Sequence, residues 1–155
     1  MANFLDALMT HITTSEQQNP IQRLLRARWM YHAGAIVLTS MFWGSGIGKA
    51  LDFAGTMGEM AHFGLYPPAL FTLLTILVQL GGSLLLVSGN RFAWLGAGAL
   101  AVFTLATIPV ALRFWEMQGP AAFMSKMTVF EHVTVVGALA VAAVAAELRR
   151  DGRSA

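Results

Sequence analysis

The chain has 155 residues, of which 56% are hydrophobic and 12% are charged, and its formal net charge at pH 7 is +2. This length suits a single domain, and the small basic excess argues against nucleic acid as a partner. Cysteine is absent, which excludes disulfides, dithiol redox chemistry, cysteine-bound iron–sulfur clusters and c-type haem attachment.

The chain begins with a polar stretch, residues 1–28, which we expect to be a cytoplasmic or interfacial tail. It lacks the continuous apolar core and the small-residue cleavage site of a signal peptide. A partner-binding arm is the alternative. Four apolar runs follow, at about 30–53, 68–89, 92–115 and 129–147, and a basic tail, 149–155, ends the chain.

Each apolar run is long enough to cross a bilayer, because ~20 apolar residues span its hydrocarbon core. Four such runs cannot be solvated by water in a soluble protein of this size. The sequence therefore predicts an all-α integral membrane protein. One domain, residues 29–148, would fold as an up-down four-helix bundle surrounded by the lipid bilayer.

The basic residues set the expected orientation of this bundle. Seven arginines fall on one side of an even number of spans, namely Arg23, Arg26, Arg28, Arg91, Arg149, Arg150 and Arg153. The side that is richer in basic residues usually faces the cytoplasm. Both termini are therefore expected in the cytoplasm, and the opposite end of the bundle is expected to face the periplasm or the cell exterior.

The two connections at the outer end carry further signals. Residues 56–63 can form a short interfacial helix, which Gly64 would end before Pro67 and Pro68 open the second span. Residues 116–127 have a similar character of a turn followed by a short helix. Within the first span, small residues recur every fourth position at Ser40, Gly44 and Gly48. This pattern allows close helix packing, either within the bundle or in a homodimer.

Ionisable residues gather at the outer ends of the spans. Lys49 and Asp52 share a helix face because they are three residues apart. They either pair with each other, or Lys49 points inward and holds an anionic or carbonyl-bearing ligand that Asp52 orients. Arg113 and Glu116 repeat this spacing in the third span, where an ion pair is the first explanation.

Three further polar residues belong to the hypothetical site. Glu131 and His132 are neighbours in the fourth span, so they point ~100° apart. His132 is either a structural histidine or a group that exchanges protons and binds a quinone carbonyl. Gln79 lies at mid-membrane, where an amide bonds either a neighbouring helix or a ligand. Trp43 and Trp115 could stack against a flat ring.

Metal and haem sites are not expected. Glu59 and His62 have the i, i+3 spacing of two ligands on one helical face, but they fall in a connection at the interface. His32 and His132 lie at opposite ends of the bundle, so they cannot both bind one haem. Nucleotide-binding loops, nucleophile elbows and zinc-protease motifs do not occur in the sequence.

A family resemblance rests on a series of short motifs. They are GSGIGKALDFAGT at 44–56, Gly64-Leu65 with Pro67, LGGSLLL at 80–86, Arg91, FTLAT at 103–107, RFW at 113–115 and QGP at 118–120. In this combination the chain resembles the DoxX family of small bacterial membrane proteins over roughly residues 25–148. It departs from the family pattern where Gln79 replaces a common glutamate, Leu112 a common histidine, and Glu131-His132 a common lysine-asparagine pair.

The resemblance implies a multi-pass protein of the bacterial inner membrane that is associated with redox complexes and quinones. The expected function is an auxiliary or quinone-interacting subunit, with a quinone as its possible ligand, rather than a stand-alone enzyme. A non-catalytic anchor or assembly factor for a redox-complex partner is the second hypothesis. A small transporter of a lipophilic or anionic solute is the third.

Overall fold

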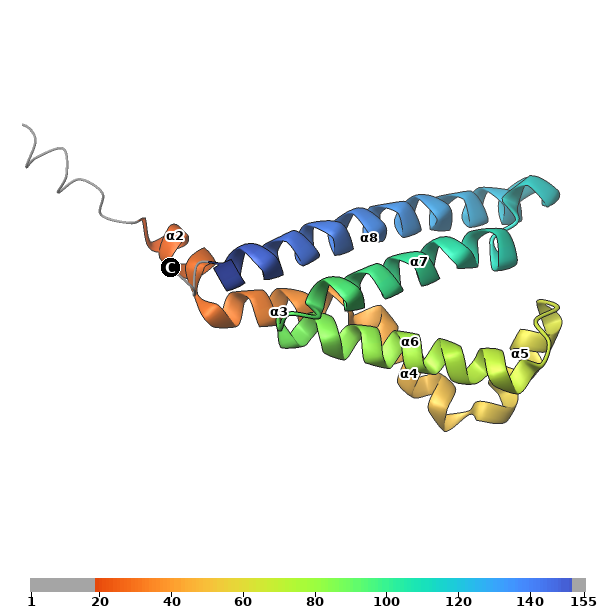
Figure 1. Cartoon of the computed structure of the whole chain (residues 1–155). Helices are drawn as coiled ribbons and strands as arrows, with labels where there is room; N and C mark the ends of the chain where they lie inside the picture. Colours follow the sequence, from red (N-terminus) through yellow and green to blue (C-terminus); the bar gives the residue numbers. More distant parts are fainter. Residues whose placement is uncertain (1–18, 152–155) are drawn as a thin grey trace, which may run out of the picture. The chain divides into compact units, whose positions relative to one another are not determined.

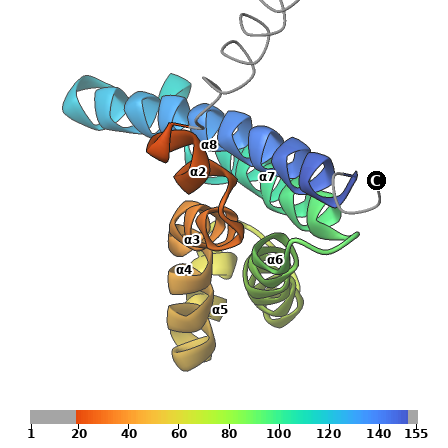
Figure 2. The same ribbon diagram turned by 90° about the vertical axis from the view of Figure 1, so that its left-hand side faces the viewer.

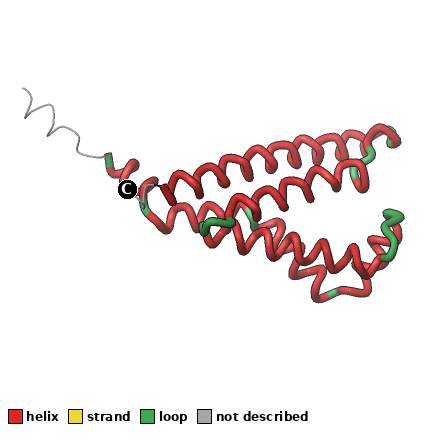
Figure 3. Tube along the Cα trace, viewed as in Figure 1, coloured by secondary structure: helices red, strands yellow, loops and turns green. Residues whose placement is uncertain are grey.

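The computed structural model describes residues 19–151, and in this range the chain contains helices and no strands (Figure 3). The elements are α2 (Pro20–Arg26), α3 (Arg28–Leu38), α4 (Ser40–Leu51), α5 (Phe53–His62), α6 (Pro68–Ser88), α7 (Ala93–Ala111), the 3-10 helix η1 (Phe114–Glu116) and α8 (Gly119–Asp151). The expected all-α class is confirmed for this range. Most of the predicted N-terminal tail and the last residues of the basic tail, with Arg153, lie outside it.

The chain divides into two units, Met1–Met30 and Tyr31–Ala155. The described part of the first unit holds α2, which begins with Pro20 after an Asn19 cap whose side chain accepts a hydrogen bond from the backbone N–H of Ile21 at 3.2 Å. Proline suits this first helical position because the missing N–H has no partner there. The second unit holds α3 from Tyr31 onward and all of the later helices.

Three helical stretches in the described range are long and apolar enough to cross a membrane. They are Pro68–Ser88, Ala93–Glu116 and Gly119–Arg150, with mean hydropathies of 2.2, 2.0 and 1.9. They coincide with the second, third and fourth predicted spans. At 1.5 Å per residue, α8 is about 50 Å long, so it exceeds the ~30 Å hydrocarbon core. The turn and short helix expected at residues 116–127 are a turn after Glu116 and the first part of α8.

The first predicted span is not one helix, because Thr39 separates α3 from α4. The Thr39 hydroxyl donates to the carbonyl oxygen of Ala35 at 2.7 Å, and the Thr39 N–H bonds the same oxygen at 3.0 Å. Helical bonding resumes at once, from the N–H groups of Phe42 and Trp43 to the Thr39 carbonyl. A threonine that bonds back into its own helix tends to bend it, so α3 and α4 are one apolar run that bends at Thr39.

The connection from α4 to α6 matches the prediction closely. Asp52 caps α5 by accepting a hydrogen bond from the N–H of Gly55 at 2.9 Å. The short helix is confirmed, although it begins at Phe53 rather than at residue 56. Gly64 adopts φ +74°, a conformation that glycine enters without steric cost. The chain then turns into α6, whose first residue is Pro68.

The helices pack in an order that forms two layers (Figure 2). α4 and α5 pack against α6, α6 packs against α7, and α7 packs against α8. The layer of α4, α5 and α6 lies close to the layer of α7 and α8 near α3, and the two separate toward α5 (Figure 1). The buried core lies at the closed end, around Leu86, Leu100 and Leu139.

α6 and α7 approach each other closely where they cross at Gly82 and Gly96. A Cβ atom on Gly96 would lie 2.5 Å from the Gly82 carbonyl oxygen, and one on Gly82 would lie 2.8 Å from a Leu100 side-chain carbon. By contrast, a Cβ on Gly44 or Gly48 would meet nothing within 4 Å in the described part of the chain. The bundle is thus closed by Gly82 and Gly96, and packing within the bundle was the wrong interpretation of the Ser40–Gly44–Gly48 row.

The C-terminal turn of α6 is capped by side chains from α3. The Tyr31 hydroxyl donates to the Leu86 carbonyl at 2.8 Å, and His32 Nδ1 donates to the Val87 carbonyl at 2.7 Å. Carbonyls in the last turn of a helix have no partner within the helix. The His32 bond satisfies the Val87 carbonyl, and Tyr31 is a second donor to the Leu86 carbonyl, which also accepts from the Gly89 N–H at 3.1 Å. Together the two side chains fix α3 to the end of α6.

Tyr31→Phe should lower the free energy of unfolding by about 1 kcal/mol, the usual net value of one such hydrogen bond. Thermal unfolding in a mild detergent measures the effect as a lower midpoint than that of wild type. Tyr66→Phe is the matched control, because the Tyr66 side chain is exposed. Equal midpoints for the two variants would show that the Tyr31 bond contributes nothing to the α3–α6 contact.

Candidate functional site

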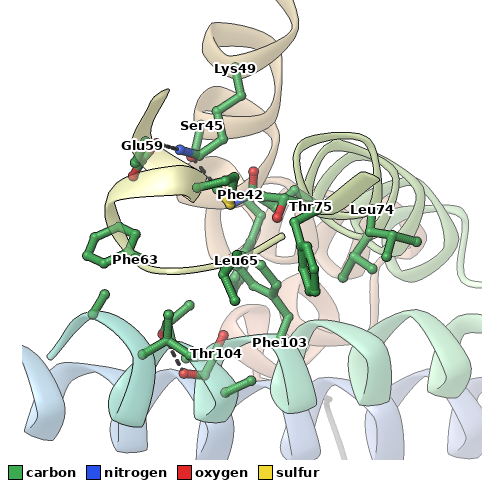
Figure 4. A pocket seen from close by; sticks show the side chains of 18 of the residues that line it. Phe42, Ser45, Lys49, Glu59, Phe63, Leu65, Leu74, Thr75, Phe103 and Thr104 are labelled. Atoms are coloured by element: carbon green, nitrogen blue, oxygen red, sulfur yellow. Dashed lines mark hydrogen bonds and ion pairs between the residues drawn. The ribbon is translucent and has the colours of Figure 1, made fainter. Parts of the chain in front are cut away.

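A cavity of ≈ 460 Å³ lies between the two layers in the open half of the second unit, and five helices contribute to its wall (Figure 4). Most of the lining is apolar, with aromatic rings from Phe42, Phe63 and Phe103. Ligand cavities typically enclose ~300–1,000 Å³ and combine an apolar wall with a few polar groups. This cavity has that composition, since polar side chains interrupt the wall at a small number of places.

Lys49 and Glu59 form an ion pair at one wall of the cavity (Figure 4). Lys49 comes from the last turn of α4, and Glu59 comes from α5. The predicted pairing of Lys49 with Asp52 was wrong, because Asp52 caps α5 instead. The chain turns back at Asp52, and this brings Glu59, ten residues beyond Lys49, against the lysine ammonium.

Gln79 and Ser45 connect α6 to α4 on the same side of the cavity. The Gln79 amide donates from Nε2 to the Ser45 hydroxyl at 3.3 Å, which confirms the predicted bond between helices. Gln79 is only 5% exposed, and its Oε1 has no hydrogen-bond partner in the described part of the chain. If Oε1 and Nε2 were exchanged, Oε1 would accept from the Ser45 hydroxyl and Nε2 would have no partner. Either way, one buried amide atom is left unbonded.

The opposite wall is formed by α7 and α8. His132 of α8 lines the cavity and donates from Nδ1 to the Thr128 carbonyl at 2.9 Å. This bond places the ring proton on Nδ1 and leaves Nε2 as the second hydrogen-bonding group of the ring. Thr104 and Thr107 of α7 also line the cavity, and their hydroxyls bond carbonyls within α7 at 2.8 and 2.7 Å.

Three of the predicted site residues, Lys49, Gln79 and His132, therefore line one cavity, although they come from three different helices. The other five do not line it, namely Asp52, Arg113, Glu131, Trp43 and Trp115.

The predicted residues outside the cavity have local contacts or are exposed. Arg113 pairs with Glu116 at 3.5 Å, as expected, and both side chains are about half exposed. Trp43 donates from its ring nitrogen to the Ile36 carbonyl at 3.3 Å, Trp115 packs edge-on against Phe114, and Glu131 is exposed. The two tryptophans consequently have no position from which to stack on a molecule inside the cavity.

Ser45 and Glu59 are cavity residues that the sequence reasoning missed. Ser45 lies four residues before Lys49 and hence on the same helix face, which is a signal that could have identified it. Glu59 had no such signal, because its position depends on the turn at Asp52. Within residues 19–151, no group of three or more His, Asp or Glu side chains could hold a metal ion.

The three membrane-length helices and the mainly apolar cavity between them define this chain as a multi-pass integral membrane protein. The sequence model of the DoxX family matches residues 33–113, which is more than half of the chain, and the chain therefore belongs to the DoxX family. The match ends within the third predicted span, so α8 and His132 lie beyond it.

A curated relative supports the assignment. The chain is 27% identical over 111 residues to "Inner membrane protein YphA" of Escherichia coli (strain K12), and the alignment covers 71% of this chain and 76% of that protein. The name of that protein places it in an inner membrane, and the three membrane-length helices of this chain fit the same multi-pass location. No solved structure matches the chain.

Proposed function

We propose that this protein binds a lipophilic molecule with an oxygen-bearing head, with a quinone as the candidate, in the cavity between its two layers. In this account it serves as an accessory subunit of a redox system in the bacterial inner membrane. The observation that carries the proposal is the unbonded amide atom of Gln79 beside an apolar cavity that Lys49 also lines.

The unbonded amide atom of Gln79 is energetically costly. A buried polar atom without a hydrogen bond costs about 1–3 kcal/mol, and a purely structural amide in a membrane bundle would be expected to satisfy both of its ends. A ligand that bonds this amide would recover the cost. A quinone carbonyl only accepts, so the amide must turn over to present Nε2 to it. Oε1 then accepts from the Ser45 hydroxyl, which can both donate and accept.

The two walls also suit the shape of a quinone. A quinone ring carries carbonyl oxygens on opposite sides. Ser45, Lys49 and Gln79 can donate to one carbonyl from the side of α4 and α6. His132 can donate to the other from α8 when its ring is protonated. Aromatic and aliphatic side chains would surround the ring and the start of its tail, which needs no polar contact.

Equilibrium binding of decylubiquinone to the full-length protein in lipid nanodiscs tests this proposal. Lys49→Ala and His132→Ala should each weaken binding at least tenfold, since each removes a polar contact that the apolar cavity cannot replace. Arg113→Ala is the control, because Arg113 does not line the cavity. If Lys49→Ala and His132→Ala bind the quinone as wild type does, the site is wrong.

The proposal includes a topology of four spans with both termini in the cytoplasm. At 1.5 Å per residue, α3 and α4 are about 17 and 18 Å long, so neither crosses a ~30 Å core alone. Together, across the bend at Thr39, they are long enough. The two arginines near the end of α8 and Arg91 between α6 and α7 favour the cytoplasm for this end.

Cysteine labelling in intact cells checks the topology. The chain has no cysteine of its own, so each introduced thiol reports alone. A membrane-impermeant maleimide should label Gln118→Cys, in the outer connection, and should label Asn90→Cys, between α6 and α7, only after the cells are opened. Both positions are exposed. Labelling of both positions in intact cells would contradict the four-span arrangement.

One observation favours the second hypothesis, a non-catalytic anchor or assembly factor. The row of Ser40, Gly44 and Gly48 is exposed along α4, where small residues permit close approach of another membrane helix. A redox-complex partner or a second copy of the chain could use this row. Loss of a co-purified partner in Gly44→Leu, with quinone binding unchanged, would support anchoring as a separate role.

A further inference from the structure

The two side chains of the Lys49–Glu59 ion pair are not equally buried. The Lys49 side chain is 19% exposed, whereas the Glu59 side chain is 46% exposed. Both line the cavity, and among the residues that the structure describes Lys49 is the one Lys or Arg side chain in its wall. A rotation of Glu59 toward the surface would therefore return its carboxylate to polar surroundings, while the lysine ammonium would stay at the cavity.

An ammonium left alone at an apolar cavity is unfavourable, because desolvation penalises a charge without a partner. Glu59 supplies that partner when the cavity holds no ligand. A ligand with its own carboxylate would supply the same charge and the same two acceptor oxygens. Exchange of one carboxylate for another leaves the net charge of the lysine contact unchanged. The ligand also buries its apolar chain in the cavity, which favours its binding, and Glu59 has no such chain to bury.

We propose that Glu59 is a displaceable counterion and that the cavity also accepts a single-chain aliphatic monocarboxylate, whose head replaces Glu59 on Lys49. This rests on the same cavity as the proposed function but concerns a second class of ligand. One ammonium matches one carboxylate. A wall that is otherwise mostly apolar matches one aliphatic chain, and a cavity of ≈ 460 Å³ suits one chain better than the two of a bilayer lipid.

Glu59 would in this way determine which head groups bind. A neutral amphiphile cannot replace the charge of Glu59, so it gains nothing from displacing that side chain. A carboxylate competes with Glu59 for Lys49, and its apparent affinity is reduced by that competition. Removing the negative charge of Glu59 should therefore strengthen binding of a carboxylate selectively, which is the opposite of what loss of an ordinary ligand contact does.

The test compares dodecanoate with dodecanol, which has the same chain and no charge, on the full-length protein in nanodiscs at pH 8. Glu59→Gln should raise the ratio of dodecanoate affinity to dodecanol affinity about tenfold over wild type. Lys49→Met should lower dodecanoate affinity at least tenfold, alone and in combination with Glu59→Gln. Glu116→Gln, whose carboxylate pairs with Arg113 outside the cavity, is the matched control and should leave the ratio unchanged.

Thermal unfolding of each variant shows that it is folded before binding is measured. The proposal is overturned if Glu59→Gln leaves the ratio at the wild-type value or lowers it, or if Lys49→Met binds dodecanoate as wild type does. Decylubiquinone, measured on the same samples, separates this proposal from the proposed function. Failure of wild type to bind the quinone, together with a raised dodecanoate ratio in Glu59→Gln, rejects the quinone and supports the monocarboxylate.

Discussion

Gly96→Ala should abolish stable folding of the protein, whereas Gly98→Ala, two residues further along the same helix, should be tolerated. A Cβ atom on residue 96 would lie 2.5 Å from the Gly82 carbonyl oxygen and 2.9 Å from the Leu86 backbone nitrogen. Backbone atoms of a packed helix cannot move aside as the end of a side chain can. We expect a loss of about 3 kcal/mol or more, at the upper end of the usual cost of overpacking.

Gly98 provides the comparison because a Cβ atom there would meet nothing within 4 Å in residues 19–151. Size-exclusion chromatography and the thermal unfolding midpoint in detergent measure both variants under one condition. The expected result is an aggregated or strongly destabilised Gly96→Ala beside a Gly98→Ala that behaves as wild type. Equal midpoints would mean that α6 and α7 do not cross at Gly82 and Gly96.

Gln79→Leu should weaken quinone binding strongly while leaving the free energy of unfolding close to or above that of wild type. Leucine fills a similar volume, has no polar atom to leave unbonded, and suits apolar surroundings better than an amide. The variant loses the bond to Ser45, worth about 0.5–1.5 kcal/mol, and also loses the unbonded amide atom, which costs about 1–3 kcal/mol. The free energy of unfolding should therefore stay within about 1 kcal/mol of wild type or rise.

The combination of both readouts distinguishes a binding residue from a structural one. Binding of decylubiquinone should fall at least tenfold in Gln79→Leu, because no other amide side chain within residues 19–151 lines the cavity wall. Gln118→Leu makes the same chemical change at an exposed position outside the cavity and should alter neither property. A Gln79→Leu protein that is clearly destabilised and still binds the quinone would assign Gln79 to packing alone.

The elements that could be predicted from the sequence are those set by local chemistry. Apolar runs place α6, α7 and α8, and Gly64 and Pro68 mark the turn between α5 and α6. The bend at Thr39 could not be predicted, because a threonine inside an apolar run is compatible with a straight helix. Its effect depends on a hydroxyl bond to Ala35 that has no sequence signature.

Helix faces and ion-pair partners depended on tertiary structure. Spacing identified Ser40, Gly44 and Gly48 as a packing row, but spacing does not say which side of α4 meets α6. The residues that close the bundle are Gly82 and Gly96, one from each of two helices, and they form no repeat within either. Likewise, the three-residue spacing of Lys49 and Asp52 suggested a pair, but the turn of the chain gave Lys49 a different partner, Glu59.

The central claim is that a lipophilic ligand occupies the cavity between the two layers. Photolabelling of the nanodisc-embedded protein with an azido-quinone, followed by peptide mass spectrometry, tests it most directly. The predicted adducts lie on cavity residues such as Met41, Phe103 and Thr107, and excess decylubiquinone should remove them. Adducts confined to side chains outside the cavity, such as Val102 or Val141, and insensitive to the competitor, would contradict the claim.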